Sequence, residues 1–156
     1  MAYATPAQLT LPILLKWALV FEEPVNRTLR IAPATPREWL APTSIGLSWN
    51  NVPTRYGRVS ASLRPLSLLV VAVNLTIVAR AVAAEEPFKP PPGGIQLSVR
   101  LPLATPRREI KAVTVGGKPW DALDPSGEGI VFSAARLGSS AFRDGLSNIL
   151  VTFGAE

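Results

Sequence analysis

Residues 95–102 read IQLSVRLP, and apolar and polar side chains alternate along the whole stretch. In an extended chain, successive side chains point to opposite faces, so the four apolar positions share one face and the polar positions share the other. This pattern is typical of a β-strand with one face on a hydrophobic core and the other face toward water.

Seven further stretches have the same strand character, and clusters of Pro, Gly, Asn and Asp separate them. They are residues 28–32, 45–49, 57–65, 68–82, 110–117, 129–134 and 148–154. A parallel sheet needs crossover connections of about a dozen residues, usually helical, and the segments between these stretches show no such helices. The sequence therefore predicts an all-β fold, an antiparallel β-sandwich.

The N-terminal part of the chain has a different period. From Leu9 to Glu23 apolar residues recur at helical spacing, and Pro24 ends the segment. We expect one short N-terminal helix. The predicted organisation is a helical segment over residues 1–24 that packs on the sandwich, and a β-sandwich domain over residues 25–156.

The composition indicates more apolar surface than one core of this size readily hides, because 47% of the 156 residues are hydrophobic and only 17% are charged. A partner domain, a second copy or a membrane would cover the excess. Residues 66–84 have about the length of a membrane span. However, Asn74 and Arg80 lie inside them, and their Val, Ile and Thr content favours buried strands. We do not expect a membrane partner.

The residue types that are missing exclude several functions. The chain has no Cys and no His, which excludes disulfides, thiolate chemistry, the usual zinc sites and catalysis by imidazole. The net charge of +5 comes from scattered arginines without interleaved aromatics, so we expect no nucleic-acid partner. We also expect no catalytic residue, no metal and no cofactor, and therefore no enzyme. An extracellular or cell-surface location is favoured, and Asn26 and Asn74 begin glycosylation triplets.

The run VTVGGKPWDALDPSGEGIVFS, residues 113–133, contains residue types found in phosphate and metal sites. A phosphate loop requires Ser or Thr after its Gly-Lys, and here Pro119 follows Lys118. Gly116-Gly117 is instead typical of a two-residue hairpin turn. Three acids in the run match no calcium loop, and residues 125–127 form a turn without any ion. These acids are Asp121, Asp124 and Glu128.

Other acids could serve catalysis only if they faced each other. The pairs Glu22-Glu23 and Glu85-Glu86 consist of adjacent residues, whose side chains usually point apart. If activity were found, Asp121 and Glu38 would be the first acids to replace, since they neighbour Trp120 and Trp39.

Three aromatic residues are candidates for glycan binding through an exposed platform: Trp49, Tyr56 and Trp120. The alternative for Trp120 is a place in the core at a strand end, which is the more frequent fate of a single Trp.

Five phrases, taken in order, resemble the C-terminal β-sandwich region that follows the catalytic (α/α)6 toroid in several bacterial families of large six-hairpin glycosidase-like proteins. They are LRIAPATPREWL, VPTRYGRVSASL, IQLSVRLP, IKAVTVGGKPWDALDPSGEGIVFS and NILVTF. The family's Pro-Arg-Glu-Trp-Leu turn, Pro-Thr-x-x-Gly corner, arginine-bearing strand and Val-x-Val-Asn-Gly-Lys-x-Trp hairpin correspond to Pro36–Leu40, Pro53–Gly57, Ser98–Pro102 and Val113–Trp120. Gly116 stands where the family commonly has Asn.

The resemblance implies an accessory domain, because the toroid that carries the catalytic acids in that family has no counterpart in this sequence. Residues LPILLKWALVFEEP take the place of the last toroid helix. The implied function is a non-catalytic module that braces a neighbouring toroid or binds glycan weakly. The alternative is a structural subunit that assembles with copies of itself into a filament or shell and buries its apolar excess between them.

Overall fold

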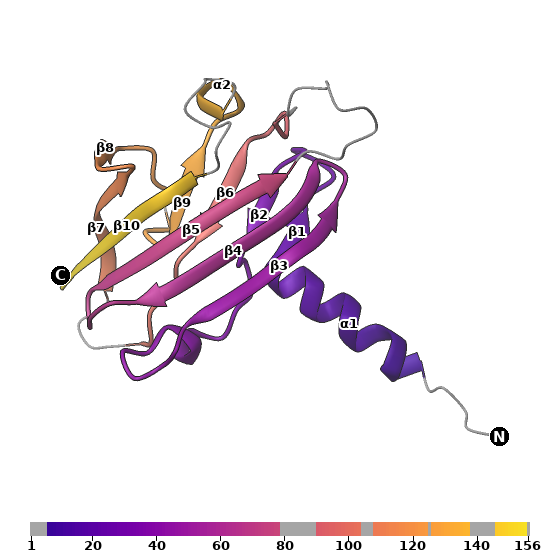
Figure 1. The fold of residues 1–156 in the computed structure, drawn as a ribbon, viewed down its shortest axis with the longest axis horizontal. Helices are drawn as coiled ribbons and strands as arrows, with labels where there is room; N and C mark the ends of the chain where they lie inside the picture. The colour runs from indigo at the N-terminus through magenta and orange to yellow at the C-terminus, as the bar shows by residue number, and fades with distance from the viewer. Residues whose placement is uncertain (1–5, 79–89, 104–107, 125, 138–145, 156) are drawn as a thin grey trace.

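The computed structural model describes residues 6–78, 90–103, 108–124, 126–137 and 146–155. Arg80 and the Glu85-Glu86 pair lie outside these residues, as does the end of the predicted strand 68–82. Within the described residues the chain forms two β-sheets with a common core, preceded by one helix (Figure 1). The predicted all-β sandwich with one short N-terminal helix is confirmed.

The smaller sheet has four strands in the order β1-β2-β6-β9. Their bounds are Val20–Glu22, Leu29–Ile31, Ile95–Ser98 and Gly129–Phe132. All its pairings are antiparallel except β2 with β6, which run parallel. This parallel pair is possible because the chain passes through β3, β4 and β5 of the other sheet before it returns as β6.

The larger sheet has six strands in the order β3-β4-β5-β10-β7-β8, all antiparallel. Their bounds, in that order, are Leu47–Thr54, Gly57–Pro65, Val70–Val78, Leu146–Ala155, Arg108–Val115 and Lys118–Trp120. The predicted hairpin at Gly116-Gly117 is confirmed, because Val115 pairs with Lys118 and both glycines have positive φ, +56° and +78°.

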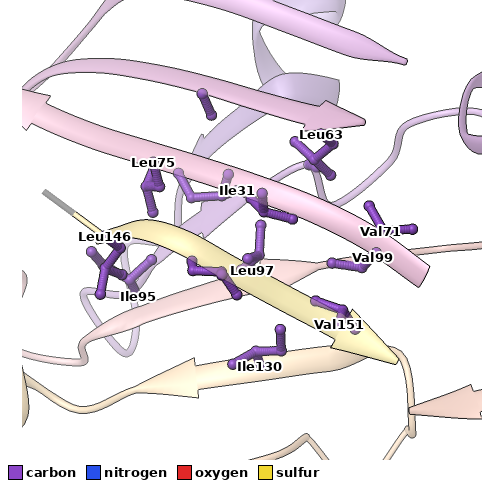
Figure 2. Close-up of a cluster of buried hydrophobic side chains, with 14 of the residues drawn as sticks. Ile31, Leu63, Val71, Leu75, Ile95, Leu97, Val99, Ile130, Leu146 and Val151 are labelled. Carbon is purple, nitrogen blue, oxygen red and sulfur yellow. The ribbon is translucent and has the colours of Figure 1, made fainter. Parts of the chain in front are cut away.

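The core lies between the two sheets. Figure 2 shows apolar side chains from both sheets meeting there, among them Leu75, Leu97 and Val151. Strand β6 ends at Ser98, earlier than the alternation predicts, yet Val99 and Leu101 remain buried. The alternation of apolar and polar residues therefore predicts the buried positions correctly as far as Leu101, although the paired strand ends at Ser98.

The described residues also form three helical elements. They are α1, Pro6–Leu19, the 3-10 helix η1, Arg37–Leu40, and α2, Ala134–Leu137. Helix α1 ends four residues before the predicted end at Glu23, because Val20 to Glu22 pair with β2 as strand β1.

Helix α1 extends away from the sheets, and its last turn is the part that lies nearest to the sandwich (Figure 1). The backbone N–H of Ala32 donates to the carbonyl of Leu19 at 2.7 Å, and Leu19 packs against the core. Five large apolar side chains of the helix are at least 48% exposed: Leu11, Ile13, Leu14, Leu15 and Trp17. Much of the apolar surface of the described part of the helix is therefore exposed.

Candidate ligand groove and the predicted site residues

Trp49 lies inside the sandwich. Its side chain on β3 belongs to the core and is only 7% exposed. The indole Nε1 has no hydrogen-bond partner in the described part of the chain. A buried ring offers no face to a sugar, so Trp49 contributes packing.

Tyr56 lies in the turn between β3 and β4 and is half-buried. Its hydroxyl donates to the carbonyl of Arg27 at 3.3 Å, and the guanidinium of Arg55 lies 5.9 Å from the ring centre. The ring therefore helps to join this turn to the smaller sheet's first hairpin.

Trp120, at the end of β8, is covered on more than one side. Its ring packs against Phe132 with 5.0 Å between centres, and its Nε1 donates to the carbonyl of Val131 at 3.2 Å. Arg136 lies over the ring at 4.6 Å and donates to Asp121 at 2.9 Å. This hydrogen bond from Arg136 lowers the pKa of the Asp121 carboxyl.

The three aromatic residues do not form one surface. Trp49 and Trp120 belong to β3 and β8, which are opposite edges of the six-stranded sheet. Adjacent strands are about 4.8 Å apart, so these edges are separated by more than about 20 Å. A platform that uses both tryptophans is therefore excluded by the strand order.

The acids of residues 121–128 have separate partners. Asp124 accepts from the backbone N–H of Ser126 at 2.7 Å and from Gln96, and the bonds to Ser126 are the main cause of its lowered pKa. Glu128 accepts from Arg37 at 2.6 Å. No group of three or more possible metal ligands gathers anywhere in the described residues.

The other described acids named in the sequence analysis do not form a carboxylate pair either. Glu22 pairs with Arg55 and Lys16, whereas Glu23 pairs with Arg30, so these adjacent carboxylates bind different cations. Glu38 is exposed on η1.

A groove on the six-stranded sheet was not predicted from the sequence. It has a volume of about 390 Å³ and crosses β3, β4 and β5 on the face that points away from the core. Ser48 pairs with Ser62, and Ser62 pairs with Asn74, so these three polar residues form one row across the strands. Ile45 and Leu66 add apolar walls, and Arg64 adds a positive charge.

The charged side chains of the segment that contains the groove strands are all positive. Between Glu38 and Glu85 the sequence contains no Asp or Glu but four arginines: Arg55, Arg58, Arg64 and Arg80. Of the three in the described residues, Arg55 pairs with Glu22, and no ion pair to a described residue is found for Arg58 or Arg64. The acid-free stretch is visible in the sequence, but the row of Ser48, Ser62 and Asn74 depends on strand register.

No protein-family model fits the chain, and no curated protein or solved structure matches it. Among the described helices, none has both the length and the apolar character to cross a membrane.

Proposed function

We propose that this chain is a non-catalytic β-sandwich module of a carbohydrate-active system, which braces a neighbouring domain through helix α1. The observation that carries the proposal is the exposed apolar helix at the N-terminal side of a well-packed sandwich. The resemblance to C-terminal sandwich regions of glycosidase-like proteins supports the association with carbohydrate.

The distribution of apolar residues on α1 favours a neighbour that surrounds the helix. Successive helical residues are about 100° apart, so Ile13, Leu14 and Leu15 face three different directions. All three side chains are about half exposed. A helix that is apolar on all sides is typically buried among other elements. A helical neighbour such as a toroid would supply contacts on several sides.

The same helix is the best candidate for contact between copies, which is the alternative function. The edges of the six-stranded sheet are poor sites for that purpose. Edge strand β3 is interrupted between Trp49 and Val52 and contains Pro53, and edge strand β8 is short and contains Pro119. Irregularities and prolines of this kind hinder edge-to-edge pairing. A pair of copies joined through α1 would bury one side of the helix and leave the others exposed.

The test uses sedimentation velocity over a wide concentration range, with the unmodified chain and the double variant L11Q/L14Q. A hydrophobic fluorescent dye reports on the apolar surface. We expect a monomer that binds the dye, weaker dye binding in the variant, and equal stability of both proteins because the two leucines are exposed.

Three results would contradict the bracing function. Assembly at rising concentration that L11Q/L14Q abolishes would favour the structural subunit. Dye binding that the variant leaves unchanged would show that α1 is not the uncovered surface. Binding to neutral phospholipid vesicles through α1 would indicate a lipid surface in place of a neighbouring domain.

A further inference from the structure

The groove on β3, β4 and β5 has a polar floor suited to a ligand with many hydroxyl groups. Ser48, Ser62 and Asn74 lie in register on adjacent strands, about 4.8 Å from one strand to the next. Two hydroxyls and a carboxamide can each donate and accept hydrogen bonds. A row of such groups matches the alternating donors and acceptors of a saccharide.

The carboxamide of Asn74 is held in one orientation. Its Oδ1 accepts from the backbone N–H of Asn148 at 3.0 Å. Asn148 has a positive φ of +56° and lies where the register of β10 against β5 shifts between Leu146 and Ile149. With Oδ1 engaged, the Nδ2 group is the part of this side chain that can donate to a ligand in the groove.

The groove has a cation but no carboxylate. Arg64 is exposed, and its cross-strand neighbour on β5 is the small Ala72. None of the strands β3, β4 and β5 contains an Asp or Glu. A guanidinium is planar and offers a fork of donors that matches a carboxylate, so an anionic group is the natural partner for Arg64.

The walls of the groove suit the apolar part of a sugar ring. Ile45 is 97% exposed and Leu66 is 55% exposed, although both line the groove. Leucine and isoleucine side chains have no hydrogen-bonding atoms, so the contacts that they offer suit the C–H groups of a ligand.

From these features we infer that the groove binds an acidic saccharide. Its carboxylate pairs with Arg64, its hydroxyls bond to Ser48, Ser62 and Asn74, and Ile45 and Leu66 contact its carbon skeleton. This inference deepens the proposed function, since it rests on an accessory module that works beside carbohydrate. A small free anion would use Arg64 alone, and a neutral sugar would leave Arg64 without a role.

The experiment measures binding to the unmodified chain by isothermal titration calorimetry. The probes are oligogalacturonate, the same oligosaccharide with its carboxylates methyl-esterified, and inorganic sulfate. R64A is the test variant. R58A is its matched control, because Arg58 lies on the same face of β4 but does not line the groove.

We expect oligogalacturonate to bind more tightly than its methyl ester and than sulfate. Loss of a charge-assisted hydrogen bond predicts about tenfold or greater weakening in R64A. R58A should bind like the parent chain. Replacing Ser62 with Leu should also weaken binding, because the larger side chain fills the floor of the groove.

Equal binding of acid and methyl ester would overturn the inference, as would equal weakening by R58A and R64A. Sulfate binding as tight as that of oligogalacturonate would indicate a small-anion site. No binding of either saccharide would also overturn it. None of these outcomes bears on α1, whose bracing function is tested separately by sedimentation and dye binding.

Discussion

The guanidinium of Arg37 donates a 2.6 Å hydrogen bond to the carboxylate of Glu128, although the two residues are 91 positions apart in the sequence. A second nitrogen of Arg37 donates to the carbonyl of Leu101 at 2.9 Å. The other oxygen of Glu128 lies 3.5 Å from Arg100. One short 3-10 helix is thereby joined to the segment after β6 and to the turn before β9.

Replacing Glu128 with Gln is expected to destabilise the fold. Only 15% of the Glu128 side chain and 20% of the Arg37 side chain are exposed, so water cannot fully replace the lost partner. Removing one member of a hydrogen-bonded pair to a charged group costs about 1–3 kcal/mol. Urea denaturation of E128Q should show a lower midpoint with an unchanged slope.

The matched control is D121N, which breaks the ion pair of Asp121 with Arg136. These side chains are 83% and 48% exposed, and exposed ion pairs contribute little to stability. D121N should unfold at the same urea concentration as the parent. If E128Q and D121N were equally stable, the Arg37–Glu128 bond would have no special structural role.

Two glycines with nearly the same φ allow steric and conformational effects to be separated. Gly94 has φ +79° and Gly117 has φ +78°. A Cβ at Gly94 would lie 2.3 Å from the carbonyl oxygen of Phe132, whereas a Cβ at Gly117 would meet nothing within 4 Å. G117A should therefore cost only the conformational penalty, roughly 1 kcal/mol.

G94A should cost much more than G117A, because the backbone around β6 and β9 must move to accommodate the added carbon. The loss of folded protein is followed by circular dichroism and by thermal denaturation of both variants. Similar melting temperatures for the two would show that the close approach to Phe132 relaxes without cost.

The sequence predicts the sandwich well because its signals are local. Alternation in residues 95–102 and 57–65, and the Gly-Gly turn at residues 116–117, need only neighbouring residues to be read. Strand β1 was missed because it directly follows helix α1 and continues its apolar run, and strand β8 because it has only three residues and contains Pro119. Their pairing with β2 and β7 is what makes them strands.

The groove could not be predicted in the same way. Ser48, Ser62 and Asn74 are separated by more than ten residues each, and only the register of β3, β4 and β5 puts them in one row. By contrast, Trp49 and Trp120 attract attention in the sequence as aromatic residues, and the structure covers both. Residue type alone does not tell on which face of a strand, or at which edge of a sheet, a side chain lies.

Stability should depend on the charge of Asp124 in acid. Its pKa is lowered from the ordinary value of 3.8, mainly by hydrogen bonds from Ser126 and despite some desolvation. A lowered pKa in the folded state means that the contribution is present above the unfolded value and is lost as the pH falls through the folded value. The unfolding free energy should therefore decrease from about pH 5 downward.

D124N should reduce this pH dependence, since Asn cannot titrate. The check is urea denaturation of D124N and the parent at neutral pH and at a pH below 3.8. The difference between the two proteins should be smaller in acid than at neutral pH. A difference that stays constant would assign the acid sensitivity of the chain to other carboxylates.

The same substitution in the core and in helix α1 distinguishes buried from uncovered apolar residues. Leu97 is fully buried between the sheets (Figure 2), whereas Leu11 is 68% exposed. L97A should destabilise the fold by about 2–5 kcal/mol, because it removes buried methyl groups and leaves a cavity. L11A should leave the urea midpoint of the monomer unchanged, since Leu11 loses no core contact. If L11A lowered the midpoint at a low protein concentration, the helix would be packed on the sandwich in solution, and the surface assigned to a neighbouring domain would already be covered.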